Sequence, residues 1–281
     1  MLKIGEEMAT LDQQTGVHAT TVIERRELAT GVVSVSLDAP QLAKTTRPGQ
    51  YIMAIPPSGE AAATALAVYE AEGKRASLLF FITGKRTHEL SELRSGDRLD
   101  VVGPLGNGFD LSEAARDVAI VAGGVGIASV LLCAQALLRN GSRVRLFYGA
   151  RTAELLVDAE RFAAAGCELV VTTDDGSRGA HGFVTDALAR ARRPDRIYAC
   201  GPSPMLRGVA RIADRFGVRA QLSLEETFGC GIGGCWGCVV PVIASSAQAP
   251  SFPPAALGGS DVVYARICKE GPVFWADELR W

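Results

Sequence analysis

The sequence predicts a multi-domain protein in which an antiparallel β-barrel is followed by an α/β domain with a parallel sheet and then by a small cysteine-rich domain. Three observations predict this order. The chain has 281 residues, which is more than one hydrophobic core usually serves. Short β-rich runs fill its first part. Strands alternate with helices in its middle, and four of its seven cysteines lie at or after position 230.

The expected barrel spans 16–112. Short β-rich runs there alternate with turns that contain Gly and Pro, such as Pro48-Gly49. Regular short strands of this kind are typical of an antiparallel barrel or sandwich. One short helix is expected at 87–97, closed by Gly96.

The α/β domain is expected over 113–221, because alternating strand and helix patterns indicate βαβ units and a parallel sheet. The expected strands lie at 117–122, 143–150, 168–173 and 196–200, and the expected helices at 126–141, 183–193 and 203–217. The run 118–138 carries no charge and is about as long as a bilayer span, which leaves a membrane span as an alternative. Gly123, Gly124 and Gly126 divide this run into a strand-like and a helix-like half, so a buried strand–turn–helix is favoured and no membrane span is expected.

These glycines also form a candidate nucleotide site. Between a strand and a helix, Gly123, Gly124 and Gly126 would let a phosphate approach backbone amides. Cys200 and Gly201 end a later strand, and ligands of open parallel sheets bind outside such strand ends. The motif is not a full G-x-G-x-x-G, so ordinary turns are the alternative.

The strongest chemical signal is a C-x4-C-x2-C spacing followed by one more cysteine, all within an expected C-terminal domain at 222–281. The four residues are Cys230, Cys235, Cys238 and Cys268. This is the spacing of plant-type [2Fe–2S] ferredoxins, in which two bridged irons need four thiolates. A zinc site or unrelated buried cysteines are the alternatives, but zinc sites commonly use two C-x2-C pairs and this chain has one. A stretch rich in Ala, Pro and Ser at 245–260 is expected to be a loop insertion.

Composition and charge exclude several other functions. Hydrophobic residues make up 48% and charged residues 21% of the chain, as in ordinary globular proteins. The net charge is −2 and no run is rich in Lys or Arg, so no nucleic-acid partner is expected. Residues 1–15 are expected to form a polar tail without the apolar core of a signal peptide. With the odd number of cysteines, this favours a reducing, cytoplasmic location.

No residue is expected to act as a nucleophile or an acid–base catalyst. The three histidines of the chain are isolated in the sequence, so no Ser–His–Asp catalytic triad is expected. Glu225 and Glu226 precede the cysteine motif and are expected to be surface groups or supporting groups of that motif.

Seven segments, in this order and spacing, recur together in one known family. They are PGQY (48–51), GPLGNGF (103–109), AGGVGIA (122–128), TDDGSRGAHGFVTD (173–186), ACGPSPM (199–205), SLEETFGCGIGGCWGC (223–238) and ARICKEGPVF (265–274). The sequence thus resembles the electron-transfer subunits of class 1B dihydroorotate dehydrogenase, within the ferredoxin–NADP reductase superfamily. The cysteine segment and the ICKEGPVF ending are the specific parts of the match, and the other segments fit the wider superfamily.

The resemblance implies that the barrel is of the flavin-binding type and holds FAD, that the α/β domain receives NAD, and that the C-terminal domain binds a [2Fe–2S] cluster. In that family, electrons pass from dihydroorotate, in pyrimidine biosynthesis, through FMN in a catalytic dehydrogenase subunit. They then pass through the cluster to FAD and to NAD. The implied assembly is a heterotetramer with that subunit. Two alternatives stay open: a related NAD(P)H-linked reductase subunit that serves another redox partner, and a flavin-free iron–sulfur relay subunit.

The positions that the resemblance assigns to FAD depart from the family's pattern. Thr64 to Ala67 replace an R-P-x-S motif, so the arginine that would pair with a flavin phosphate is absent. A G-x-G-T motif appears as residues 84–87, in which Lys85 or Arg86 could supply the missing positive charge. We therefore expect FAD to bind, but less tightly than in relatives with the full motif. The implied FAD contacts are Thr64, Ala65, Leu66, Ala67, Leu79, Phe80, Phe81, Arg86 and Thr87.

Overall fold

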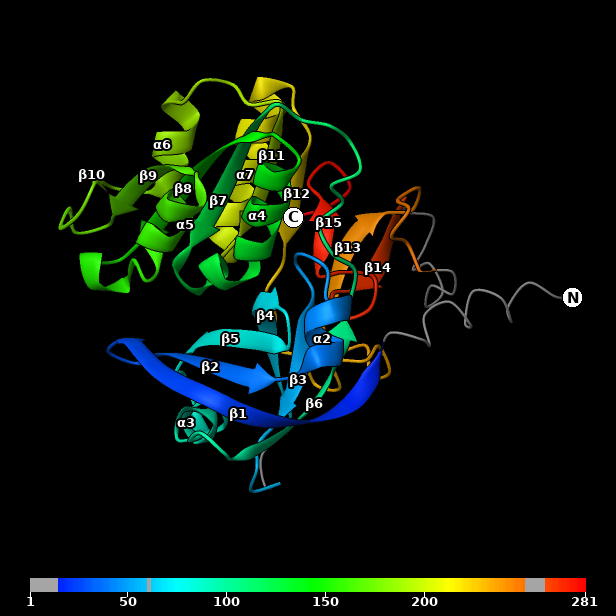
Figure 1. The fold of residues 1–281 in the computed structure, drawn as a ribbon. Helices are drawn as coiled ribbons and strands as arrows, with labels where there is room; N and C mark the ends of the chain where they lie inside the picture. The colour runs from blue at the N-terminus through cyan, green and yellow to red at the C-terminus, as the bar shows by residue number, and fades with distance from the viewer. Residues whose placement is uncertain (1–14, 60–61, 251–260) are drawn as a thin grey trace, which may run out of the picture.

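The computed structural model of the protein describes residues 15–59, 62–250 and 261–281 (Figure 1). Most of the polar tail expected at 1–15 and the second half of the loop expected at 245–260 lie outside these residues. A barrel occupies the lower part of the view in Figure 1, and an α/β sheet with helices on both faces occupies the upper part. The C-terminal strands lie beside both, so the chain after the sheet returns to the junction of the two larger units.

The first unit is a closed six-stranded barrel in which every strand pair is antiparallel, with the order β1-β2-β5-β4-β3-β6. Its elements are β1 (Gly16–Ala29), β2 (Val32–Asp38), α2 (Pro40–Thr45), β3 (Tyr51–Ile55), β4 (Thr64–Glu72), β5 (Arg75–Phe81), α3 (Lys85–Ser91) and β6 (Arg98–Leu105). Its core is filled by fully buried aliphatic side chains such as Val33, Leu37 and Ile52. The predicted antiparallel barrel is confirmed, and the helix expected at 87–97 begins two residues earlier and ends at Ser91.

The second unit is a seven-stranded sheet with the order β10-β9-β8-β7-β11-β12-β15. Its strands are β7 (Asp117–Gly123), β8 (Arg143–Ala150), β9 (Glu168–Thr173), β10 (Ala180–His181), β11 (Arg196–Cys200), β12 (Ala220–Ser223) and β15 (Val273–Trp275). Its helices are η1 (Gly124–Ser129), α4 (Leu131–Arg139), η2 (Ala153–Leu155), α5 (Ala159–Ala165), α6 (Val184–Arg190) and α7 (Ser203–Phe216). All pairs are parallel except β12 with β15, so the predicted parallel sheet is confirmed.

The uncharged run at 118–138 forms most of β7, η1 and the start of α4. Every residue of β7 is buried, because helices cover both faces of a parallel sheet and its central strands have no solvent-facing side. None of the helices in the described residues is long and apolar enough to cross a membrane. The hydrophobic run is therefore explained by the core of the sheet.

The C-terminal segment joins the two larger units. Strands β13 (Val239–Ile243) and β14 (Val262–Arg266) form a separate antiparallel pair, whereas β15 adds to the edge of the α/β sheet beside β12. Asn107, just after barrel strand β6, accepts a hydrogen bond from the Val273 amide at 3.0 Å and donates its own backbone amide to the Gly271 carbonyl at 2.7 Å. The cysteine-bearing segment is thus held against both the barrel and the sheet.

Candidate functional site

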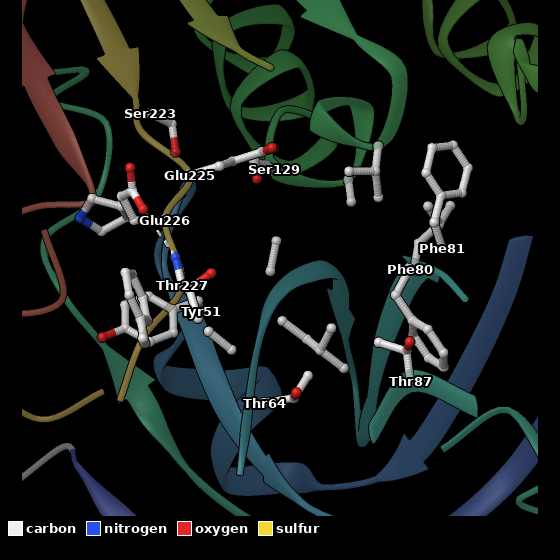
Figure 2. A pocket seen from close by; sticks show the side chains of 18 of the residues that line it. Tyr51, Thr64, Phe80, Phe81, Thr87, Ser129, Ser223, Glu225, Glu226 and Thr227 are labelled. Carbon is white, nitrogen blue, oxygen red and sulfur yellow. Dashed lines mark hydrogen bonds between the residues drawn. The ribbon is translucent and has the colours of Figure 1, made fainter. Parts of the chain in front are cut away.

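The first cavity, of about 380 Å³, lies between the barrel and the α/β unit (Figure 2). All nine residues that the resemblance assigns to FAD lie on its wall. They are Thr64, Ala65, Leu66, Ala67, Leu79, Phe80, Phe81, Arg86 and Thr87. They come together because β4 and β5 are antiparallel neighbours and α3 follows β5 directly.

The opposite wall of this cavity comes from elements that the FAD assignment did not include. Val125 and Ser129 of η1 close one side, and Figure 2 shows Glu225 beside Ser129. The extended segment after β12 closes the other side with Thr227, which is labelled in Figure 2, and with Phe228. These positions carry no local motif, so only the return of the chain after β12 places them at the cavity.

Arg86 is the one cationic side chain among the described residues that line this cavity. Its Nη1 donates to the Ala63 carbonyl at 3.1 Å, which holds the guanidinium at the start of β4. The Thr87 hydroxyl accepts hydrogen bonds from the backbone amides of Thr83 and Gly84 at 2.9 and 3.2 Å. Those amides are already paired, so the guanidinium is the group that can meet an anionic ligand here.

The second cavity, of about 550 Å³, lies at the carboxyl ends of the parallel strands, where open α/β sheets bind their ligands. Its lining includes Gly123 and Gly124 from the turn after β7, Arg151 after β8, Asp174 after β9 and Met205 of α7. Apolar side chains make up much of the rest. Such a lining, with a few polar groups at strand ends, suits an elongated ligand of mixed polarity.

The five residues expected to bind a nucleotide divide into two groups. Gly123 and Gly124 line the second cavity, and Gly124 has a φ of +53°, which favours glycine. Gly126 instead packs on the end of β11, where an added Cβ would lie 2.3 Å from the carbonyl oxygen of Cys200. Cys200 is fully buried, and Gly201, with a φ of +153°, packs against Gly123 and Met205. Those three residues shape the cavity from behind its wall.

The two cavities share part of their lining. Phe81, Val125 and Glu225 lie on the wall of both. The Cys200 thiol lies behind this shared wall, and its Sγ is 3.5 Å from Glu225 Oε1. A ligand in one cavity and a ligand in the other would therefore meet at this position.

The shared wall contains two titratable groups whose neutral forms are favoured. Burial raises the pKa of the Cys200 thiol, and the nearby Glu225 carboxyl raises it further. The Glu225 side chain stays open to solvent through the cleft, yet crowding by protein atoms raises the pKa of its carboxyl. The sequence indicated a surface or supporting role for Glu225, whereas the structure places it on the wall of both cavities.

The four cysteines of the motif lie in two pairs. The backbone amides of Gly234 and Cys235 lie 3.2 and 3.4 Å from Cys230 Sγ and donate to it. The amide of Cys268 donates to Cys238 Sγ at 3.4 Å. Cys230 is also within hydrogen-bonding range of the Cys235 thiol, and Cys268 is within range of the Cys238 thiol. Within residues 15–59, 62–250 and 261–281, no group of three or more His, Cys, Asp or Glu side chains is arranged to hold a metal ion.

The two pairs differ in their electrostatics. Desolvation opposes ionisation of the Cys230 thiol, but hydrogen bonds from the amides of the cysteine loop lower its pKa to about 6. Burial and the neighbouring Cys238 thiol raise the pKa of Cys268 to about 12. Gly231 and Gly233 have φ values of +70° and +87°, which let the loop curl so that its amides face the sulfur. The thiolate form of Cys230 is thus favoured, whereas Cys238 and Cys268 form a buried pair.

Comparison with known proteins assigns the family. The chain is 34% identical over 259 residues to the dihydroorotate dehydrogenase B (NAD(+)) electron transfer subunit of Caldanaerobacter subterraneus subsp. tengcongensis, covering 92% of this chain and 96% of that protein. It is 35% identical to the corresponding subunit of Geobacillus kaustophilus, covering 94% of this chain and 98% of the relative. The chain belongs to the family of dihydroorotate dehydrogenase B electron transfer subunits.

Other matches extend this family assignment to the fold. The profile of the oxidoreductase NAD-binding domain matches residues 120–211, the part that surrounds the second cavity. A solved structure of an NADH-dependent reduced ferredoxin-NADP oxidoreductase, studied for flavin-based electron bifurcation, is 31% identical. The match covers 95% of this chain and 91% of the oxidoreductase chain, with a TM-score of 0.79. The ferredoxin reductase in carbazole 1,9a-dioxygenase shares the fold with a TM-score of 0.64. It is 24% identical, and the match covers 73% of this chain and 67% of that reductase. This chain thus shares its fold with both of these reductases.

Proposed function

We propose that this chain passes electrons from a partner dehydrogenase, through a [2Fe–2S] cluster and FAD, to NAD. The partner is an FMN-containing catalytic subunit that oxidises dihydroorotate, in a heterotetramer. The region 16–112 would hold FAD, 113–221 would receive NAD, and 222–281 would carry the cluster. When bound, FAD would exchange single electrons with the cluster and a hydride with NAD. The observation that carries the proposal is the wall that the two cavities share at Phe81, Val125 and Glu225.

The first cavity suits a flavin in its volume and in the chemistry of its lining. Its volume of about 380 Å³ lies within the range of cofactor pockets. The side chains of Ala65, Leu66 and Phe81 would bind an apolar ring system, and Phe81 also lines the second cavity. Arg86, whose guanidinium is held at the Ala63 carbonyl, would pair with a phosphate of the ligand, since a guanidinium matches phosphate oxygens.

The cysteine pairs fit a two-iron cluster better than a single ion. Each iron of a [2Fe–2S] cluster takes two thiolates, and the chain offers Cys230 with Cys235 and Cys238 with Cys268. Amides that point at Cys230 Sγ and Cys238 Sγ would stabilise negative charge on the sulfurs.

At the shared wall, this chain's own residues would orient the ligands and hold a proton near their contact. The Cys200 thiol fills the space behind the junction of the two cavities. The Glu225 carboxyl, with its raised pKa, would hold a proton beside this contact more readily than an ordinary glutamate. Phe81 would help to exclude water from the contact, because its ring lines both cavities.

The direct test is anaerobic purification followed by cofactor analysis. We expect a brown protein with about two irons and two sulfides per chain, a flavin released on denaturation that is identified as FAD, and bleaching of the flavin spectrum by NADH. Stoichiometric zinc without labile sulfide would reject the cluster. An intact cluster without FAD binding at high FAD concentration would support the flavin-free relay instead.

Cys268→Ser tests the fourth ligand. We expect a loss of cluster occupancy, because an alcohol replaces one of four thiolates. Cys167→Ala, which changes a buried cysteine next to strand β9 and outside the motif, is the matched control and is expected to keep the cluster. A full cluster spectrum in Cys268→Ser would move the fourth ligand to another residue.

The similarity to the NADH-dependent reduced ferredoxin-NADP oxidoreductase favours a second candidate, in which the same relay serves a different redox partner. The partner distinguishes the two candidates. Affinity purification of the tagged chain from its native host should recover a flavoprotein that reduces the chain's cluster when dihydroorotate is added. Recovery of a partner that does not respond to dihydroorotate would favour the second candidate.

A further inference from the structure

Tyr51, the first residue of β3, touches both the first cavity and the cysteine segments. Its ring lines the first cavity and packs against Phe228 at 5.1 Å between ring centroids. Its hydroxyl lies 2.7 Å from the Gly231 carbonyl and 2.8 Å from the Cys268 carbonyl. The side chain is buried, so these contacts are made away from water.

The two acceptors belong to parts of the cysteine segment that lie far apart in the sequence. Gly231 directly follows Cys230, whereas Cys268 is the last cysteine of the motif. One hydroxyl proton is shared between the two carbonyls, so Tyr51 ties both parts of the segment to the same barrel strand. Met53 on the same strand packs so closely on Gly231 that an added Cβ would lie 2.3 Å from its Sδ. Strand β3 therefore forms a common base under both cysteine pairs.

We propose that Tyr51 is a positioning residue that sets the electronic coupling between the cysteine-bound cluster and the flavin. This inference rests on the proposed function. The hydroxyl fixes the backbone next to Cys230 and at Cys268, and the ring extends from there to the wall of the first cavity. For each electron that passes, one iron of the cluster is oxidised and the flavin is reduced, and Tyr51 itself changes neither oxidation state nor protonation.

The physical reason lies in the carbonyls that accept the hydrogen bonds. Hydrogen bonds and buried dipoles near cluster sulfurs set the reduction potential, and their loss alters both potential and activity. Without the hydroxyl, the Gly231 and Cys268 carbonyls lose a donor in a buried site, and the backbone that carries both cysteine pairs is free to shift.

The test compares Tyr51→Phe with Tyr69→Phe in the holoprotein. Tyr51→Phe keeps the ring and removes the hydroxyl. Tyr69 is a matched control, because it is a buried barrel tyrosine whose hydroxyl donates to Asp158 Oδ2 at 2.8 Å and touches no cysteine segment. The readouts are the electron paramagnetic resonance spectrum and midpoint potential of the cluster, and the rates of flavin and cluster reduction by NADH in a stopped-flow instrument.

In Tyr51→Phe we expect a shifted cluster spectrum and midpoint potential, and a ratio of cluster reduction to flavin reduction by NADH that is about tenfold lower than in the wild type. Tyr69→Phe should match the wild type in all of these. Wild-type cluster spectrum, potential and rate in Tyr51→Phe would overturn the inference. A wild-type protein that lacks the cluster or FAD would instead reject the proposed function.

Gly231→Ala gives a second route if Tyr51→Phe does not fold. It leaves Tyr51 intact but pushes the Gly231 carbonyl away, because of the positive φ and the contact with Met53. We expect the same slower cluster reduction and the same direction of spectral change. A variant with wild-type cluster properties would contradict the role of this contact.

Discussion

The two ends of strand β7 are built for different purposes. At its amino end, the Asp117 carboxylate forms ion pairs with Nη2 of Arg143 at 3.0 Å and with Nη2 of Arg145 at 3.1 Å. Arg192 also forms an ion pair with this carboxylate. At its carboxyl end, Gly123 and Gly124 carry no side chain and border an open cavity. The same strand thus has a densely charged, closed end and a bare, open end.

This difference separates stability from ligand binding. The amino end of β7 contributes to the stability of the fold, and its carboxyl end contributes to the cavity. Arg145 is 7% exposed and its guanidinium also lies over the Phe147 ring at 5.9 Å, so the amino-end cluster is part of the core. No residue of that cluster lines either of the two cavities. Substitutions at the amino end should therefore change the free energy of unfolding, and substitutions at the carboxyl end should change ligand binding.

Asp117→Ala should have the largest effect, a loss of about 3–5 kcal/mol in the free energy of unfolding, because the buried Arg145 charge is left without its carboxylate. Urea denaturation measures it, and NADH and FAD affinities in the folded protein should be unchanged. Asp100→Ala, which breaks the exposed pair with Arg98, is the control and should cost about 1 kcal/mol or less. An unaltered unfolding midpoint in Asp117→Ala would contradict the conclusion that the charge cluster at the amino end of β7 stabilises the fold.

Arg86→Ala should come next, with FAD affinity lowered about ten- to a hundredfold, or roughly 1.5–3 kcal/mol, through loss of a charge-assisted hydrogen bond. Titration of the apoprotein with FAD measures the loss, and riboflavin, which lacks phosphate, should bind the variant and the wild type equally. Lys85→Ala removes the neighbouring charge, which does not line the cavity, and should leave FAD affinity unchanged. Equal losses for FAD and riboflavin would show that Arg86 acts on the fold and not on the phosphate.

Gly124→Val should raise the KM for NADH about tenfold, equivalent to about 1.4 kcal/mol. A branched side chain at a φ of +53° would displace the turn and narrow the cavity next to Phe81. Steady-state assays with an artificial electron acceptor measure this effect, and the cluster spectrum should stay the same. The control is Gly141→Val, a positive-φ glycine in open space between α4 and β8. Unaltered NADH kinetics in Gly124→Val would exclude this turn from the nucleotide site.

Glu225→Gln should have the smallest effect and tests the raised pKa of Glu225 through pH. The unfolded chain ionises this carboxyl at a lower pH than the folded protein does. The wild type therefore loses stability as pH rises from the ordinary glutamate pKa to the raised folded value. The variant lacks this group, so its free energy of unfolding should fall less over that interval. Parallel pH profiles for the two proteins would contradict the shift.

Local patterns predicted the barrel and the sheet because their strands are regular and buried. The all-buried strand β7 produced an uncharged run, and the glycines after it marked the turn. The sequence could not distinguish glycines that border a cavity from glycines that pack. Gly126 was expected beside a phosphate, but it lies against the Cys200 carbonyl because η1 approaches β11 closely.

The rest of the site depends on contacts between distant segments. The Tyr51 hydroxyl reaches the Cys268 carbonyl, and barrel residues line the same cavity as Glu225, because the chain after β12 returns to the barrel. The spacing of the cysteines predicted four thiols in one region, but the pairing of Cys238 with Cys268 depends on the β13–β14 hairpin that brings them together. No local periodicity carries such information.

The antiparallel pairing of β12 with β15 has a consequence for protein engineering. Ser223 and Val273 are cross-strand partners, so the chain leaves the α/β sheet for the cysteine region and returns to it at the same point. A two-residue turn of the kind that joins hairpin strands would connect them directly. The region between is therefore connected to the sheet through one pair of neighbouring residues, although it also contacts the barrel through Tyr51 and Asn107. Its exchange for another domain would leave the order of the remaining strands unaltered, but would remove Glu225, Thr227 and Phe228 from the cavity walls.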